Sequence, residues 1–363
     1  MLFKNTIKLS HILQRGENNF DIIRLFAAIM VIFGHSFYLF PTGGFVEPVT
    51  QLVKRNFSGT LAVGIFFFIS GILITQSYVQ TKSALRFTLM RVARIYPGAL
   101  FCLFAVTLIL GPLVTTLSPS AYLTSAGPYC YLRDNWSFTN FFWFWPPGCY
   151  SLPGVFEKNI YAGAINGSLW TIFPELACYF YILVLGMLGG LNTRNRIILI
   201  VIALLTIHAI APKLVPYFSQ DSYSDTLKVA LFFLAGVLAF ALRDWLTLRW
   251  IYLVPLVFET VMFRGSIYQE YPLFLTIFYF VLLIGSSKWL RAVKLPGDYS
   301  FGVYIYGWPI QQAVAHFWPS LTSYPSNLIC IPLAVLAGYA SWNLIERPAL
   351  TAARRFTAKS KPS

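Results

Sequence analysis

The segment FDIIRLFAAIMVIFGHSFYLF (residues 20–40) is apolar over the length of a bilayer, yet it contains Arg24 and His35. About 20 predominantly apolar residues allow an α-helix to cross the hydrocarbon core. A charged side chain at that depth costs several kcal/mol unless a partner compensates it. The segment therefore predicts a membrane-spanning helix in which two ionisable residues have a specific role.

The composition of the whole chain also indicates an integral membrane protein. Of its 363 residues, 57% are hydrophobic, 11% are charged and 18% are aromatic, and the mean hydropathy is +0.65. Soluble proteins carry roughly 25% charged residues, so this chain has too few to cover a surface that faces water. The net charge of +14 is divided into short clusters between apolar runs. That pattern is typical of cytoplasmic loops and does not favour a nucleic-acid partner.

We expect an all-α, polytopic fold with about ten transmembrane helices. The predicted spans are 21–40, 60–79, 96–115, 167–188, 196–211, 227–242, 250–264, 271–287, 298–318 and 327–345. With the N-terminus in the cytoplasm, twenty of the 27 basic residues fall in cytoplasmic segments, as the positive-inside rule requires. Both termini are therefore predicted to be cytoplasmic.

This orientation divides the chain into a cytoplasmic tail (1–20), a transmembrane domain (21–345) and a second cytoplasmic tail (346–363). No small-residue cleavage site follows the first apolar run, so we expect that run to remain as a helix. Residues 2–13 are compatible with a short amphipathic helix on the membrane or with an unstructured tail.

The longest outward-facing connection, residues 116–166, is rich in aromatic residues and proline. Connections of this length usually carry function or are disordered, and the aromatic content argues against disorder. A lid over an outward-facing site and a packed structural cap both fit.

Cys130 and Cys149 lie in this loop, and a disulfide between them is expected in an oxidising compartment. The cysteines within predicted spans are expected to be small buried hydrophobic residues: Cys102, Cys178 and Cys330.

The spacing of Arg24 and His35 places both side chains on one face of the helix. Eleven residues at ~100° each end about 20° past three full turns, and they span roughly 16 Å along the axis. A phosphate-binding cation at the membrane boundary and an imidazole deeper inside would suit the extended pantetheine arm of coenzyme A. Two alternatives remain open: Arg24 as an interfacial anchor, and His35 as a buried histidine bonded to a neighbouring helix.

Five stretches in order resemble the acyltransferase-3 family of bacterial membrane O-acyltransferases. They are FDIIRLFAAIMVIFGHS (20–36), FFFISGILIT (66–75), RFTLMRVARIYPG (86–98), LPGVFEKNIYAGAINGSLWTIFPELACYFY (152–181), and the pair DYSFGVYIYGWPIQQ (298–312) and IERP (345–348). Together they cover nearly the whole chain. One position departs from the family, since many members have a histidine where this sequence has Gly307.

The resemblance implies transfer of an acyl group, most often acetyl, from cytoplasmic acyl-CoA to a hydroxyl of an extracytoplasmic or lipid-linked polysaccharide. It implies a multi-pass protein of the bacterial plasma (inner) membrane, in contact with membrane lipid. The family's functional residues fall on Arg24, His35, Trp170, Glu175 and a basic loop that contains Arg86, Arg91 and Arg94.

For the chemistry, we expect His35 to act as the general base, because imidazole titrates near neutral pH. An acyl-histidine intermediate is the less favoured route. Glu175 is predicted at a similar depth to His35. It is expected to orient the imidazole or to bind the acceptor, and a protonated or helix-bridging carboxylate is the structural alternative. Arg24 is expected to hold phosphate or to stabilise the oxyanion.

The three arginines of the basic loop, Arg86, Arg91 and Arg94, suit the phosphates of acetyl-CoA, although anionic lipid would attract them equally. Asn166, Ser168 and Trp170 are expected to line the acceptor site. No P-loop, GxGxxG or HExxH pattern occurs, so we expect neither a metal nor a nucleotide-hydrolysis site. The rival interpretation is a non-enzymatic transporter or flippase in which His35 and Glu175 relay protons.

Overall fold

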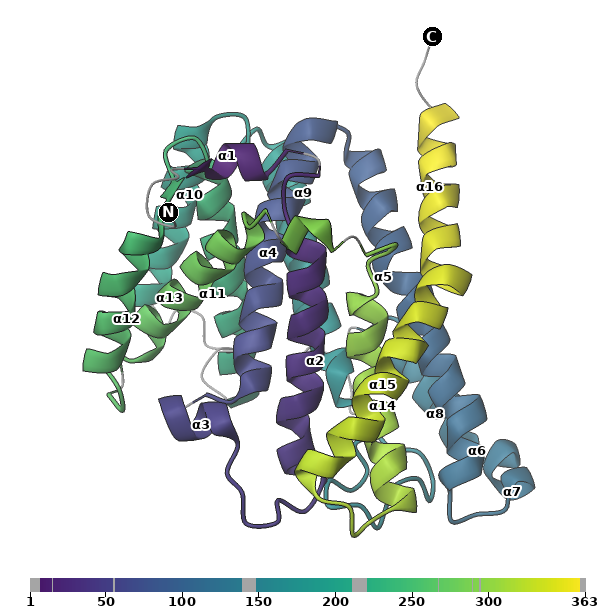
Figure 1. Cartoon of the computed structure of the whole chain (residues 1–363). Helices are drawn as coiled ribbons and strands as arrows, with labels where there is room; N and C mark the ends of the chain where they lie inside the picture. The colour runs from purple at the N-terminus through teal and green to yellow at the C-terminus, as the bar shows by residue number, and fades with distance from the viewer. Residues whose placement is uncertain are drawn as a thin grey trace. The chain divides into compact units, whose positions relative to one another are not determined.

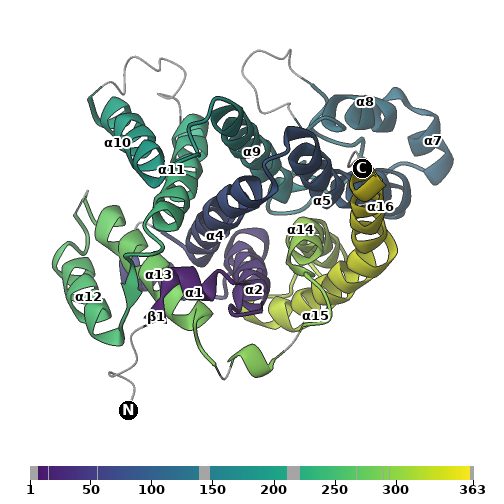
Figure 2. The same ribbon diagram turned by 90° about the horizontal axis from the view of Figure 1, so that it is seen from above.

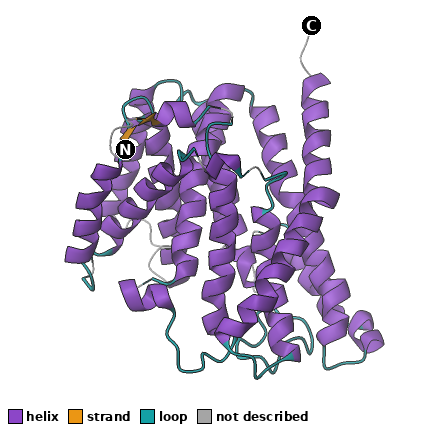
Figure 3. Ribbon diagram, viewed as in Figure 1, coloured by secondary structure: helices purple, strands orange, loops and turns teal. Residues whose placement is uncertain are grey.

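The computed structural model is built almost entirely of helices (Figure 3). It describes residues 7–14, 16–54, 56–138, 148–210, 221–266, 268–288, 290–293 and 295–359. Over these residues the only strands are β1 (Ile7–Lys8) and β2 (Thr247–Leu248), which pair antiparallel. The expected all-α class is confirmed.

The chain forms two compact units. Unit 1 comprises residues 1–27, 48–88 and 174–296, and unit 2 comprises residues 28–47, 89–173 and 297–363. The boundary after residue 27 falls inside α2 (Phe20–Leu39), so this helix begins in unit 1 and ends in unit 2.

Unit 1 is a helical bundle in which α4 (Ser58–Thr81) packs along α11 (Asp221–Ala241). α13 (Glu270–Gly285) packs against α4 and against α12 (Leu253–Met262), as Figures 1 and 2 show. Its other helices are α1 (Leu9–Ile12), α3 (Pro48–Val53), α9 (Ile172–Met187), α10 (Arg194–Ile210), η4 (Trp250–Tyr252) and η5 (Leu290–Ala292).

The beginning of the chain folds onto unit 1. β1 pairs with β2, and the N–H of Leu9 donates to the carbonyl of Leu246 at 3.0 Å. Leu9 and Ile12 lie three residues apart on one face of α1, and both are almost fully buried. Residues 7–14 are therefore a packed element of the bundle and not a free tail.

Unit 2 contains the second half of α2 and most of α5 (Ala84–Ala105), together with the antiparallel neighbours α14 (Ser300–Phe317) and α15 (Ser323–Ser341). The approach of α14 to α15 is close, because a Cβ on Gly302 would lie 2.7 Å from the Cα of Gly338. The remaining elements are η1 (Val106–Leu110), α6 (Gly111–Val114), α7 (Pro119–Thr124), α8 (Ala126–Asn135), η2 (Gly167–Thr171), η6 (Trp342–Glu346) and α16 (Arg347–Lys359).

A helix occupies each of the ten ranges in which the sequence predicts a span. Within the described part of the chain, five helices are long and apolar enough to cross a membrane: Phe20–Leu39, Ser58–Thr81, Ala84–Val114, Gly167–Met187 and Ser323–Ala358. Two shorter apolar helices are Trp250–Met262 and Glu270–Gly285. The protein is a membrane protein, while the total of ten crossings and the placement of the termini stay predictions.

Two predicted boundaries are wrong, and both helices are longer than expected. The helix that ends at Val114 begins at Ala84, so Arg86, Arg91 and Arg94 lie on a helix and not in a basic loop. No glycine or proline interrupts residues 84–96, and charged residues do not break a helix. Likewise the helix from Ser323 continues to Ala358 through the predicted tail. Its 36 residues measure about 54 Å, which exceeds the thickness of a hydrocarbon core of about 30 Å.

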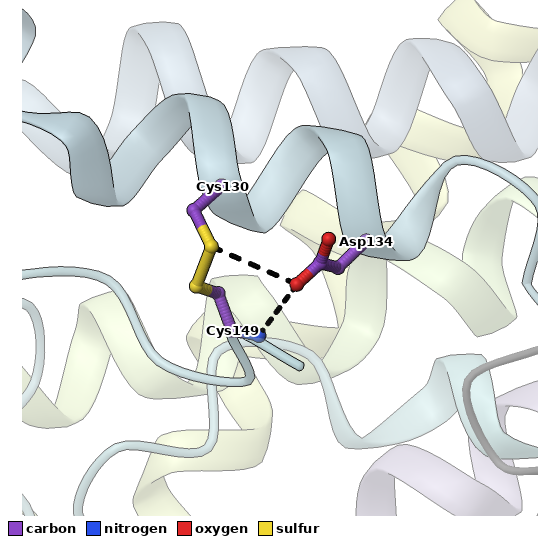
Figure 4. A group of neighbouring side chains, drawn as sticks. All are labelled: Cys130, Asp134 and Cys149. Atoms are coloured by element: carbon purple, nitrogen blue, oxygen red, sulfur yellow. Dashed lines mark hydrogen bonds between the residues drawn. A yellow bond between two sulfur atoms is a disulfide. The ribbon is translucent and has the colours of Figure 1, made fainter. Parts of the chain in front are cut away.

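The predicted outward loop is partly helical, since it contains α7 and α8. The expected disulfide between Cys130 and Cys149 is confirmed, with the two Cα atoms 5.8 Å apart (Figure 4). The other three cysteines are free and buried, as expected. Residues 139–147, the centre of the aromatic stretch, lie outside the described residues.

Candidate active site

His35 lies in the part of α2 that belongs to unit 2, about 22 Å along the helix from Phe20. Its side chain is half-buried. The indole of Trp308, on α14, packs against the imidazole with ring centroids 4.8 Å apart and an interplanar angle of 81°. The predicted base therefore has an aromatic neighbour that fixes one side of its ring.

The segment of α2 that carries His35 is held by polar side chains from two helices. The Nε2 of Gln311, on α14, donates to the carbonyl of Ile32 at 2.8 Å. On the other side, the Nδ2 of Asn327, on α15, donates to the Oγ of Ser36 at 2.9 Å. Gln311 is fully buried and Asn327 is 8% exposed. Paired amides of this kind favour one register of the helices over others.

Gly307 explains how α14 comes so near to α2. A Cβ at this position would lie 2.7 Å from Cγ1 and 3.0 Å from Cδ1 of Ile32. A side chain here would force the side chain of Ile32 to shift, at the residue whose carbonyl accepts the hydrogen bond from Gln311. The position at which the sequence departs from the family is therefore a packing position in this chain.

Asn166 begins the NGSLW stretch (166–170) and makes one hydrogen bond within the stretch and one to α14 of the same unit. Its Oδ1 accepts the N–H of Ser168 at 3.1 Å and so caps η2. Its Nδ2 donates to the carbonyl of Ile305, on α14, at 2.9 Å. Ser168 is 1% exposed, and its Oγ has no hydrogen-bond partner among the described residues. Trp170 is half-buried in η2. Binding of an acceptor by these three residues stays a prediction.

Glu175 belongs to unit 1, where it ends a short hydrogen-bonded chain. The hydroxyl of Tyr179, one turn later on α9, donates to its Oε1. The same hydroxyl lies 3.4 Å from the Oγ of Ser70 on α4. The predicted pairing of Glu175 with His35 would join residues of different units, and it stays a prediction.

Arg24 is also in unit 1, on the first half of α2. Its guanidinium lies 5.8 Å from the ring centroid of Phe66 on α4. Phe66 and Ser70 are one turn apart, so the FFFISG element contacts both Arg24 and the chain that leads to Glu175.

Arg94 has two carboxylate partners in unit 2. One nitrogen of its guanidinium pairs with Glu346 at 2.8 Å and the other pairs with Asp298. The side chain of Glu346 is fully buried, and that of Arg94 is 12% exposed. Because both acids neutralise this arginine, a phosphate of acetyl-CoA would have to compete with them. Arg86 is exposed and Arg91 is half-buried on α5. Contact of the three arginines with coenzyme A stays a prediction.

Four polar or aromatic residues of unit 2 surround the region of His35 and the NGSLW stretch, and sequence reasoning assigned none of them a role: Asn159, Trp308, Gln311 and Gln312. Gln312 is fully buried, and its Nε2 donates to the carbonyls of Tyr161 at 2.8 Å and Ala164 at 2.9 Å. Its Oε1 accepts the Nδ2 of Asn159 at 2.7 Å. The signal available in the sequence was the pair of adjacent glutamines, Gln311 and Gln312, within an apolar span.

Cys130, Asp134 and Cys149 are the one group of metal-ligating side chains in the described part of the chain. Both sulfur atoms belong to the disulfide, so neither is a thiolate. Asp134 instead accepts the N–H of Cys149 at 2.9 Å, and its Oδ2 lies 3.6 Å from the Sγ of Cys130 (Figure 4). This group is a structural bridge between α8 and Cys149.

Comparison with known proteins agrees with the five motifs. The chain is 28% identical over 353 residues to an O-acetyl transferase of Shigella phage Sf6, covering 95% of this chain and 98% of that protein. It is 33% identical over 171 residues to Nodulation protein 10 of Rhizobium leguminosarum bv. viciae, covering 45% and 42% of the two chains. No solved structure matches. The family model, described as an acyltransferase domain, matches residues 17–343. The chain therefore belongs to the acyltransferase-3 family and is a membrane acyltransferase.

Proposed function

We propose that this protein transfers an acetyl group from acetyl-CoA to a hydroxyl group of an extracytoplasmic or lipid-linked polysaccharide, with His35 as the general base. The donor enters from the cytoplasm, and the protein works in a bacterial plasma (inner) membrane. The full-length similarity to an O-acetyl transferase supports transfer of acetyl to oxygen.

The observation that carries the assignment of the base is the setting of His35. A half-buried imidazole in a spanning helix packs against Trp308, in the unit that also contains the NGSLW stretch. An ionisable residue at such a position is rarely without function. His35 is about 22 Å from the start of α2, so a helix that begins at one membrane surface would carry it beyond the middle of a hydrocarbon core of about 30 Å.

The reaction needs one proton acceptor. The hydroxyl oxygen of the sugar attacks the thioester carbonyl carbon while Nδ1 or Nε2 of His35 takes the hydroxyl proton. The tetrahedral intermediate then collapses and breaks the C–S bond. The imidazolium returns its proton to the leaving thiolate, so the products are the acetyl ester and free coenzyme A. General-base assistance of this kind contributes about 10²–10⁴-fold.

A base within the membrane can be reached by two substrates from opposite sides. Acetyl-CoA approaches from the cytoplasmic side, where Arg86 and Arg91 supply positive charge near the beginning of α5. A glycan approaches from the opposite side. A base that lies between the two surfaces serves both substrates without exposing the thioester to bulk water.

The test is transfer of radiolabelled acetyl from acetyl-CoA into the glycan fraction of membranes that contain equal amounts of wild-type protein or variants. His35→Ala is expected to lower transfer at least 100-fold. His316→Ala is the matched control, because His316 is also in unit 2 and contacts the rings of Phe156 and Phe317. It is expected to retain transfer within a factor of two.

Wild-type transfer by His35→Ala would overturn the assignment of the base. No labelled glycan with any variant, together with no binding of acetyl-CoA to wild-type membranes, would overturn the acetyltransferase proposal itself. Label that remains on the protein when acceptor is omitted, and that hydroxylamine releases, would indicate an acyl-histidine route instead.

A further inference from the structure

Trp308 links two segments that are distant in the sequence. It is 7% exposed on α14, and its indole packs against His35 of α2. Its Nε1 donates to the carbonyl of Ala164 at 2.9 Å, immediately before the NGSLW stretch. The indole is thus fixed by a hydrogen bond at one end while it contacts the imidazole.

Gly167, in the NGSLW stretch, lies close to the indole ring of Trp308. A Cβ on Gly167 would lie 2.9 Å from each of Cδ2, Cε2 and Cε3 of Trp308. Real Cβ contacts are essentially never this short, so an alanine here would displace the indole. The φ angle of Gly167 is not in the left-handed region. Close approach to Trp308, and not backbone conformation, is therefore what requires glycine at this position.

The indole of Trp308 is held by its hydrogen bond to Ala164, and its ring packs against the imidazole of His35. A T-shaped contact at 4.8 Å is a favourable arrangement for two aromatic rings. It restricts rotation of the imidazole about its Cβ–Cγ bond. Since a general base works only when its nitrogen points at the reacting hydroxyl, the orientation of Trp308 affects the efficiency of His35.

We propose that Trp308 is the positioning residue of His35, and that Gly167 of the NGSLW stretch serves to seat the indole in its working orientation. Trp308 acts through the imidazole and has no contact of its own with the reacting atoms. This inference rests on the proposed function of His35 as the base.

The test compares acetyl transfer by Trp308→Phe, Gly167→Ala and the double variant, each normalised to folded protein in detergent. Each single variant is expected to lower kcat about tenfold and to leave KM for acetyl-CoA within a factor of two. Phenylalanine lacks the fused second ring, whose Cε2 and Cε3 would meet a Cβ at position 167. The double variant is therefore expected to be no worse than Trp308→Phe alone, because the steric conflict of Gly167→Ala has been removed.

A second cycle places Trp308→Phe in the His35→Ala background. Because Trp308 acts only through the imidazole, the residual transfer is expected not to fall further. In the wild-type background the midpoint of the pH–rate profile of kcat is also expected to move with Trp308→Phe, which a purely structural defect would not cause. Trp318→Phe is the control, since Trp318 is 54% exposed just beyond α14. It is expected to leave all parameters unchanged.

Equal losses from Trp308→Phe with and without His35 would overturn the proposal, as would multiplicative losses in the Gly167 cycle. Failure of the proposed function has a different result, namely equal transfer by wild type and His35→Ala. If Trp308→Phe yields too little folded protein, Gly167→Ala alone still tests the inference through its pH–rate profile.

Discussion

Gly71 and Gly236 bring the backbones of α4 and α11 into direct contact. A Cβ on Gly71 would lie 2.1 Å from the carbonyl oxygen of Phe233, and one on Gly236 would lie 2.1 Å from that of Phe68. Small residues at such crossings allow membrane helices to pack closely. The glycine of the FFFISG element is therefore a packing residue of unit 1.

Gly71→Ala is expected to destabilise the protein by about 1–3 kcal/mol, the usual effect of inserting atoms into a packed interior. Gly71→Val is expected to destabilise it further, and Gly236→Ala to match Gly71→Ala. The measurement is the midpoint of thermal unfolding of detergent-purified protein. An unchanged midpoint for Gly71→Val would show that α4 and α11 do not pack through these glycines.

Stability and KM measurements on Arg94 variants distinguish a structural role of this arginine from a role in binding acetyl-CoA. Removing it leaves Glu346 fully buried without its cation, and breaking a buried ion pair costs about 3–5 kcal/mol. Arg94→Ala is therefore expected to lower the unfolding midpoint strongly, while KM for acetyl-CoA of the folded fraction stays near the wild-type value. Replacing both residues, as in Arg94→Leu with Glu346→Leu, is expected to recover much of the loss.

The exposed Arg86 is the control for this prediction, because Arg86→Ala removes an arginine of the same helix without breaking a buried pair. It is expected to leave stability unchanged and to raise KM for acetyl-CoA severalfold if the cluster attracts phosphates. If Arg94→Ala instead raises KM for acetyl-CoA with no change in stability, Arg94 binds coenzyme A and is not a structural residue.

The sequence predicts the helices well because length and hydropathy are local properties. Each predicted span coincides with a helix, and Arg24 and His35 share α2 as their spacing requires. The start of α5 at Ala84 was missed because the arginines of residues 86–94 lower the hydropathy without ending the helix. Hydropathy predicts where a helix is apolar, and not where it begins.

Contacts between distant segments were not predictable in the same way. Nothing near Trp308 in the sequence indicates that its indole meets His35, and nothing near Arg94 identifies Asp298 and Glu346 as its partners. These pairs depend on how α2, α5, α14 and η6 pack. Family resemblance identified the segments, while the geometry shows which side chains within them meet.

Tyr179 is expected to orient the carboxylate of Glu175. Tyr179→Phe removes the hydroxyl that donates to Oε1 and retains the ring. If Glu175 works in catalysis or acceptor binding, this variant lowers kcat/KM for the glycan about tenfold, which corresponds to roughly 1.4 kcal/mol. Ser70→Ala removes the more distant partner at 3.4 Å and is expected to have a smaller effect. Full activity of Tyr179→Phe with an inactive Glu175→Gln would show that the carboxylate needs no such support.

Asp134 is expected to make the Cys130–Cys149 bridge sensitive to acid. Its carboxylate accepts hydrogen bonds from Arg133 and from the N–H of Cys149, and both hold its pKa below the ordinary value of 3.8. A depressed pKa means that the stabilisation of the folded protein by Asp134 is complete above about pH 4 and is lost as the pH falls through the folded-state pKa.

The measurement is the rate at which a phosphine reduces the bridge, relative to the rate in denatured protein. This rate is therefore expected to be slow and constant between pH 5 and 7 and to accelerate below about pH 4. Asp134→Ala should be reduced faster than wild type between pH 5 and 7, with no acid-dependent step, and the two rates should converge at low pH. Arg133→Gln is the control: its side chain is 73% exposed, and an exposed ion pair stabilises little, so its rate at pH 7 should match wild type. An acid-dependent step that persists in Asp134→Ala would assign the sensitivity to another group.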